Sequence, residues 1–305
     1  MYRLRLDLHI IRFHADSIGS AVPRDCFDAT IQSVFNSSVN LQLDPEDRLV
    51  TIHRSDHYNL PQGIRIADPN VRLNSLAVDQ NAALRGGVLR FTASPLTIDL
   101  RGASIWTGKI PVINTGFEKS WWMAWQALNE EQRLKQTELI AEDLFRTTST
   151  SRLIRTLNQP IFRLFTAFER YDLLSGMEAA SRLIGLGPGV TPSGDDVLIG
   201  FMAGLYCTAG TDQKKLVLIQ AFGSALCLLA KGTNDISRTF LFHAARGEFA
   251  SSLVTLVEAI QNGEERALYL TLKGSMQVGH SSGTDSVTGL LIGLAVWDAV
   301  LIKMI

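Results

Sequence analysis

The amino-acid sequence predicts an α+β protein in which an antiparallel β-rich domain precedes a mostly helical domain. Six of the nine prolines lie within the first 111 residues, and proline is disfavoured inside helices. Apolar residues in this part often recur with period two, as in Val39, Leu41 and Leu43, which is typical of half-buried strands. From Lys119 onwards, long helix-forming stretches follow. A chain of 305 residues is long enough for two such domains.

The first domain is expected at residues 1–115, as an antiparallel sheet or a small barrel. Turn-forming segments at 44–47, 68–70 and 86–87 separate the predicted strands, and the intervals between them are too short for crossover helices. The second, helical domain is expected at residues 116–305. Its predicted helices include residues 130–146, 151–157, 212–231, 236–245 and 249–260.

Charge and cysteine content narrow the class of protein. Lys and Arg number 29 against 30 Asp and Glu, a net charge of −1, so no broad basic face for nucleic acid is expected. The three cysteines are widely spaced, and neither a disulfide framework nor a zinc site is predicted. Charge interrupts the N-terminal segment, and Asp298 lies within the apolar C-terminal run. We therefore expect a cytoplasmic protein that crosses no membrane.

Two Gly-rich polar loops, each followed by an apolar helix, are the most informative segments. They span residues 185–196 and 279–285, and Ser282 follows Ser193 by 89 residues in an internal repeat of the form SGxDxxxGxxxGL. Two glycines spaced four residues apart lie on one face of each following helix, which allows a neighbouring helix to approach closely. We expect the two helices to pack together. If they run parallel, both loops open at the same end.

These loops are predicted to bind a small anion such as phosphate or a carboxylate. Each Ser-Gly-x-Asp segment supplies capping oxygens and the free N–H groups of a helix N-terminus. A capped turn uses the same residue types, but two dense copies favour a ligand site. Neither a dinucleotide-binding GxGxxG motif nor a P-loop lysine is present. The expected binding residues are Gly187, Gly189, Thr191, Ser193, Gly194, Ser281, Ser282, Gly283 and Asp285.

Three residues of the loops are candidates for catalysis. Asp195 and Asp196 could hold Mg²⁺ together with substrate oxygens, or simply cap the helix. His280 could act as an acid, a base or a donor to an anion, or it could be structural. No dedicated metal site is predicted, and Mg²⁺ is the one cofactor that the paired carboxylates would suit.

A third polar segment, residues 231–238, follows a long apolar helix and begins another. Thr233, Ser237 and Arg238 are further candidates for anion binding. Arg238 could clamp a carboxylate or phosphate, or it could be a solvated side chain beside a capped turn.

Three segments, in this order, resemble the AllH-like family. They read GLGPGVTPSGDDVLIGFMAGL, TNDISRTFLFHAARGEF and GHSSGTDSVTGLLIGL, and the N-terminal SVFNSSVNLQL with the following LVTI is also similar to that family's opening region. The resemblance covers most of the chain. Asn234 stands where a second threonine is expected after Thr233.

The resemblance implies a subunit of a multi-subunit oxamate carbamoyltransferase of purine and allantoin breakdown, acting with FdrA-like and AllG-like subunits. The implied reaction moves a carbamoyl group between an oxalurate-type donor and phosphate, giving carbamoyl phosphate and oxamate. Two hypotheses stay open. The chain is either an enzyme subunit in which backbone N–H groups and Arg238 stabilise charge, or a noncatalytic subunit whose loops bind a small anion or dock a partner.

Overall fold

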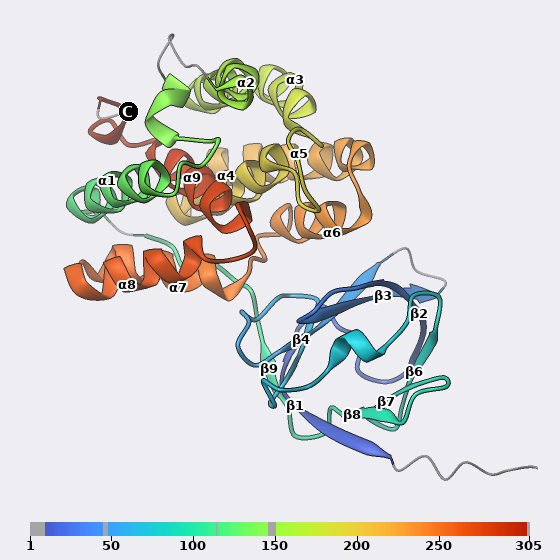
Figure 1. Cartoon of the computed structure of the whole chain (residues 1–305). Coiled ribbons are helices and arrows are strands. Elements are labelled where there is room, and N and C mark those ends of the chain that lie inside the picture. Colours follow the sequence, from blue (N-terminus) through green and yellow to red (C-terminus); the bar gives the residue numbers. More distant parts are fainter. Residues whose placement is uncertain (1–9, 45–47, 114, 146–150, 304–305) are drawn as a thin grey trace, which may run out of the picture. The chain divides into compact units, whose positions relative to one another are not determined.

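A computed structural model describes residues 10–303 except 45–47, 114 and 146–150 (Figure 1). The chain forms two compact units that divide between Gly108 and Lys109. Strands make up the first unit and helices dominate the second. The predicted α+β class, with strands before helices, is confirmed.

The first unit is a closed β-barrel, which decides between the sheet and the barrel that the sequence allowed. Eight strands follow one another in the order β5-β4-β3-β2-β6-β7-β8-β1, and β1 pairs with β5 to close the ring. Ser17 and Ile18 of β1 pair with β5 on one side and with β9 on the other. Strands β8 and β9 therefore pair one after the other along the same edge of β1. The strands are β1 (Ile11–Gly19), β2 (Phe27–Val34), β3 (Ser38–Asp44), β4 (Leu49–Arg54), β5 (Gly63–Ile66), β6 (Asn81–Arg85), β7 (Val88–Phe91), β8 (Leu96–Asp99) and β9 (Ser104–Trp106), with a 3-10 turn η1 at Leu73–Ser75.

Most neighbouring strands of the barrel are antiparallel, as expected, but three pairs are parallel. Strand β1 runs parallel to β8 and β9, and β4 runs parallel to β5. Strand β1 lies between β5 and β8 in the ring, so closure of the barrel joins segments that are far apart in the sequence. The period-two pattern reflects inward-facing apolar side chains, and Ile31, Leu41, Ile52 and Ile64 have no exposed surface.

The second unit contains nine α-helices in its described residues, with short 3-10 turns between some of them. They are α1 (Glu118–Leu134), α2 (Arg152–Glu169), α3 (Leu173–Leu183), α4 (Ser193–Ala209), α5 (Gln213–Leu229), α6 (Asp235–Ala244), α7 (Ser251–Asn262), α8 (Glu265–Met276) and α9 (Ser282–Ala295), with η2 (Ala141–Phe145), η3 (Ala230–Gly232) and η4 (Leu301–Lys303).

One predicted helix, residues 130–146, is wrong. Helix α1 begins earlier and ends at Leu134, because Gln136 adopts a left-handed backbone conformation with a φ of 52°. Helix α5 has the length and composition of a membrane span. It buries Ile219, Phe222 and Leu226 in the helical core, whereas its Val217 and Leu228 are exposed.

Helices α4 and α9 form the centre of the helical unit and lie side by side (Figure 1). A Cβ atom at Gly200 would overlap the carbonyl oxygen of Ser286, and one at Gly204 would lie 2.5 Å from the backbone nitrogen of Leu294. The contacts advance along both helices in the same direction, so α4 and α9 run parallel. The expected packing is confirmed, and the orientation brings both N-termini to one end.

The backbones meet so closely because the four glycines of the repeat face one another. A Cβ atom at Gly289 would overlap the carbonyl oxygen of Val197, and one at Gly293 would overlap that of Phe201. Trp121 of α1 fixes the pair from outside, since its Nε1 donates to the carbonyl oxygen of Leu291 at 2.8 Å. The position of the two loops therefore depends on this helix contact.

Replacing Gly200 by Ala is expected to lower the free energy of unfolding by at least about 3 kcal/mol, because the new methyl group has to push two backbones apart. Gly232→Ala is the matched control, since its methyl group would meet only the side-chain Cγ2 of Ile184 at 3.3 Å. Urea unfolding followed by circular dichroism measures both variants. Equal stability of the two variants would contradict the close backbone contact.

Candidate functional site

The two repeated loops meet at the N-terminal ends of α4 and α9. The hydroxyl groups of Thr191 and Ser282 are hydrogen-bonded to each other. Thr191 lies two residues before the start of α4, and Ser282 is the first residue of α9. The two loops therefore lie next to each other at the same end of the helix pair.

Both loops are held by the same kind of backbone hydrogen bond and pack on the helix before them in the same way. The structural repeat therefore includes these preceding helices. The Gly194 N–H donates to the carbonyl of Leu186 at 2.8 Å, and the Gly283 N–H donates to that of Val278 at 2.9 Å. A Cβ atom on either glycine would overlap the carbonyl oxygen of a residue in α3 or α8. We therefore assign these two glycines to the packing of the loops, because the N–H groups expected to face an anion already donate within the chain.

Asp196 and Asp285 are the buried acidic groups of the junction, with only 4% and 2% of their surfaces exposed. Hydrogen bonding from Ser282 and Thr191 favours the ionised form of Asp196, and hydrogen bonding from Ser193 does so for Asp285. Each carboxyl group thus faces the serine that begins the other helix. The Ser-Gly-x-Asp motif therefore links the two copies across the junction.

Burial dominates the electrostatics of this pair. It raises the pKa of Asp196 well above its usual range, and the negative charge of Asp285 raises it further. Burial also raises the pKa of Asp285 to about 6. The Oδ2 atom of each carboxyl group has no hydrogen-bond partner among the described residues. Two buried carboxylates that each leave one oxygen without a hydrogen-bond donor are costly, so the pair favours retention of a proton near neutral pH.

Asp195 has a different environment from its neighbour Asp196. Its Oδ1 accepts a hydrogen bond from the Gly185 N–H at 2.8 Å, and its Oδ2 accepts one from the Thr233 hydroxyl at 2.6 Å. Burial raises its pKa, and these hydrogen bonds lower it. Since both of its oxygens accept hydrogen bonds, Asp195 joins the first loop to the third polar segment.

The third polar segment packs on the first loop. Asn234 caps α6 by accepting from the Ile236 and Ser237 N–H groups, and its Nδ2 donates to the carbonyl of Val190 at 2.8 Å. Ser237 is buried beside this contact, and its hydroxyl oxygen has no hydrogen-bond partner among the described residues. Arg238 forms an ion pair with Asp235 at 3.0 Å, one turn before it on α6. All three sequence segments of interest therefore converge, and Asn234 ties two of them together where a threonine was expected.

The outer face of the junction carries the remaining predicted residues. Gly189 and His280 are exposed, and Gly187 and Ser281 are half-buried. Gly187 and Gly189 adopt φ values of 119° and 99°, which explains why the loop uses glycine there. The described residues contain no group of three His, Cys, Asp or Glu side chains that could hold a metal ion.

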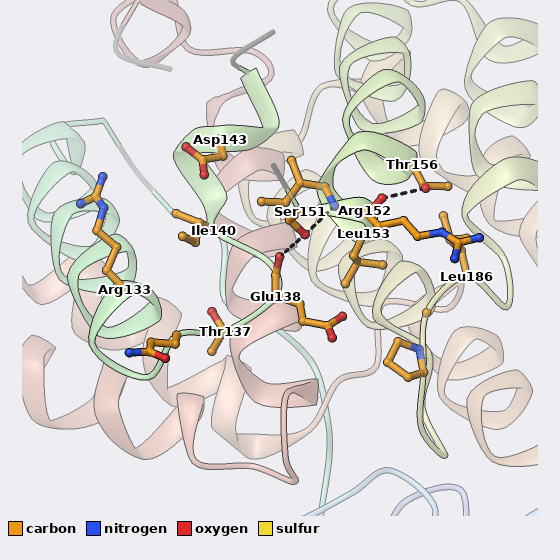
Figure 2. A pocket seen from close by; sticks show the side chains of 14 residues that line it. Arg133, Thr137, Glu138, Ile140, Asp143, Ser151, Arg152, Leu153, Thr156 and Leu186 are labelled. Carbon is orange, nitrogen blue, oxygen red and sulfur yellow. Dashed lines mark hydrogen bonds between the residues drawn. The ribbon is translucent and has the colours of Figure 1, made fainter. Parts of the chain in front are cut away.

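A pocket lies beside the first loop, between it, the start of α2 and the segment after α1 (Figure 2). It is open, with a volume of about 940 Å³, and Leu186, Gly187 and Pro188 form one wall. The Arg152 side chain reaches toward Leu186 from the opposite wall, and the Ser151 hydroxyl donates to the carbonyl of Glu138 at 2.9 Å. Its described lining contains no residue of the second loop. This pocket therefore adjoins the first loop and not the second.

Two family models match the chain, and they cover both units. Residues 11–105 match the N-terminal domain of the AllH family, and residues 183–294 match the oxamate carbamoyltransferase subunit AllH. The second match begins at the last residue of α3 and ends within α9, so it contains all three converging segments. No solved structure shows a significant match.

Thr233→Val is expected to lower the free energy of unfolding by about 2 kcal/mol, because it leaves one oxygen of the fully buried Asp195 without its donor. Thr255→Val on α7 is the control, since the hydroxyl of this exposed residue donates to the backbone carbonyls of Ser251 and Ser252 in the preceding turn. Its effect should stay below about 0.5 kcal/mol. Urea unfolding at pH 7 compares them, and a small effect of both variants would show that the Asp195 contact adds little.

Stability is expected to fall as the pH rises from about 4 to about 6. The pKa of Asp285 is about 6 in the folded chain and about 3.9 in an unfolded one, so between these values the folded state binds more protons. The stabilisation that the protonated Asp285 contributes is complete below its unfolded pKa of about 3.9, and it is lost as the pH rises through its folded pKa of about 6. Asp285→Asn should remove about 2 to 3 kcal/mol of this fall, as measured by urea unfolding across the range.

Asp212→Asn is the control for this pH experiment, because Asp212 is the exposed N-cap of α5 and asparagine caps a helix equally well. Its stability profile should follow that of the unmodified chain. A profile of Asp285→Asn parallel to both would contradict the raised pKa of Asp285.

Proposed function

Because this chain belongs to the AllH family, whose name denotes a subunit of oxamate carbamoyltransferase, we propose that it takes part in carbamoyl transfer between an oxalurate-type donor and phosphate. The donor, oxamate, phosphate and carbamoyl phosphate are all small anions. We propose that one of them binds at the junction of the two loops. Since the family name denotes a subunit, the active protein is a multi-subunit complex, for which we propose FdrA-like and AllG-like partners.

The parallel arrangement of α4 and α9 is the observation that carries this proposal. Two helix N-termini at one place add their positive partial charges, which favours a bound anion. Thr191, Ser281 and Ser282 offer hydroxyl groups on the half-buried rim, and the exposed His280 adjoins them. Retention of a proton by Asp196 and Asp285 lowers the negative charge behind this rim. The junction thus combines hydrogen-bond donors with reduced repulsion of an anion.

The reaction needs such donors. A phosphate oxygen attacks the carbamoyl carbon, the carbonyl oxygen becomes negatively charged, and the carbon–nitrogen bond to oxamate then breaks. Hydroxyl and N–H donors fixed around that oxygen lower the barrier, because they stabilise charge that develops only in the transition state. His280 is a candidate for the donor nearest to solvent, and we propose that partner subunits supply the rest of the substrate site.

A second function, noncatalytic anion binding or partner docking, is favoured by one observation. The carboxyl groups of Asp196 and Asp285 are enclosed in this structure, so they do not contact a substrate directly. In that case the loops would sense a small anion or fix the partner subunits, and the reacting groups would belong to those subunits.

An assay of the assembled complex distinguishes the two functions. With oxalurate and phosphate as substrates, we expect the chain with FdrA-like and AllG-like subunits to form carbamoyl phosphate. The double variant Thr191→Ala, Ser282→Ala should lower kcat/KM at least about tenfold, because it removes two donors from the proposed site. Thr255→Ala on α7 serves as the control and should leave the rate unchanged.

The assay separates the two functions by showing whether the double variant affects anion binding alone or carbamoyl transfer as well. Undiminished carbamoyl transfer by a complex that no longer binds phosphate or oxamate at this chain would establish the noncatalytic function. A complex that forms no carbamoyl phosphate with the unmodified chain would overturn the proposed reaction.

A further inference from the structure

We propose that Asp196 and Asp285 form a carboxyl pair that holds a single proton and exchanges it with a bound ligand through the hydroxyl groups of Ser282 and Thr191. The exchange with substrate rests on the proposed function, whereas the pair itself does not. Since both carboxyl groups act through hydroxyls, they are positioning residues for proton transfer.

The geometry of the repeat supports the pair. Asp196 and Asp285 occupy matching places in the first turns of two parallel helices, whose glycines hold the backbones together. Each carboxyl group leaves one oxygen, Oδ2, enclosed and without a hydrogen-bond partner in the part of the chain that the structure describes. The charge of Asp285 acts on Asp196. A proton is the smallest group that satisfies two such oxygens.

The surroundings of the pair leave its charge uncompensated. Its described neighbours at the junction are hydroxyl groups and the carboxyl group of Asp195, whose negative charge also raises the pKa of Asp196. Neither carboxyl group of the pair forms an ion pair with a described Lys, Arg or His. Two ionised carboxylates in such a place repel each other and lose their hydration. One shared proton removes most of that cost, as in other buried carboxyl pairs.

Two hydroxyl groups connect this enclosed pair with the rim of the junction. Thr191 and Ser282 are bonded to each other, are half-buried, and both favour the ionised form of Asp196 by hydrogen bonding. A hydroxyl group can accept a proton on one side and donate its own on the other. The arrangement therefore allows a proton to move between Asp196 and the rim without exposing the carboxyl group.

Carbamoyl transfer requires that a proton be removed from one reactant and that a proton be supplied to another. When hydrogen phosphate attacks an oxalurate-type donor, its P–OH group loses a proton as the new oxygen–carbon bond forms. The amide nitrogen of the departing oxamate takes up a proton as its bond to the carbamoyl carbon breaks. The reaction consumes no proton overall. A pair with one proton can donate to the nitrogen and then recover the proton of the phosphate.

The pair itself is tested on the full chain without substrate. Carbon-13 labelling of the aspartate carboxyl groups, followed by NMR between pH 3 and pH 10, gives the titration of each group. We expect two linked steps, one near pH 6 and one well above the ordinary carboxylate range. In Asp285→Asn the step of Asp196 should move to lower pH, because the neighbouring negative charge is gone. Asp212→Asn is the control and should change neither step.

The relay is tested by the pH dependence of kcat in the assembled complex. A pair that works with one proton gives a bell-shaped profile whose limbs follow the two steps. Asp285→Asn should abolish the acidic limb and shift the alkaline limb to lower pH. Asp196→Asn should lower kcat on the order of 100-fold with a smaller change in KM, and Ser282→Ala should resemble it. A merely structural role would lower activity equally at every pH.

Each alternative result has a definite meaning. Two independent titrations in the ordinary carboxylate range would overturn the pair. A linked titration with an unchanged kcat profile in Asp285→Asn would overturn the relay. Displacement of the shared proton by millimolar Mg²⁺ or K⁺, seen as a shift of both carboxyl signals, would make the place a cation site and also overturn the proposal. A complex inactive at every pH would refute the proposed function and its relay, while the titration would still decide on the pair.

Discussion

The close backbone contact between α4 and α9 is the constraint on which the rest of the helical unit depends. Glycines on both helices leave no room for a Cβ atom between the chains, so the helices can meet in only one register. That register aligns their first turns and brings Thr191 against Ser282. A change of register by one turn, about 5.4 Å, would separate these groups beyond hydrogen-bond distance.

The same contact explains why acidic side chains are buried at the junction. In a single helix, Asp196 or Asp285 would lie in the first turn, where a carboxylate interacts favourably with the helix dipole. In the pair, each is covered by the other copy of the repeat, and burial raises the pKa of both. Asp195 avoids this conflict because it accepts hydrogen bonds from Gly185 and Thr233. Neighbouring residues of one motif thus acquire different chemistry.

Family membership and geometry address different parts of the function. Membership in the AllH family indicates a subunit of oxamate carbamoyltransferase, but a family name does not identify reacting atoms. The junction contributes paired helix N-termini, half-buried hydroxyl groups and an enclosed carboxyl pair. These features suit small anions whose chemistry moves protons without net uptake, and this agreement gives the proposed reaction a physical basis in the chain itself.

The sequence by itself determined the order of β-rich and helical parts, the inward-facing strand pattern and the repeated motif, because these depend on local periodicity and spacing. It also predicted that the glycine-bearing helices pack together. Only the tertiary structure decided the barrel closure, the parallel direction of α4 and α9, and the burial of Asp196 and Asp285 at the junction, since each depends on residues far apart in the chain. Local chemistry suggested that Gly194 and Gly283 face an anion, whereas packing against α3 and α8 requires them for steric reasons. Glycine is needed in either case, and the sequence cannot show whether a ligand or a carbonyl oxygen occupies the space beside it.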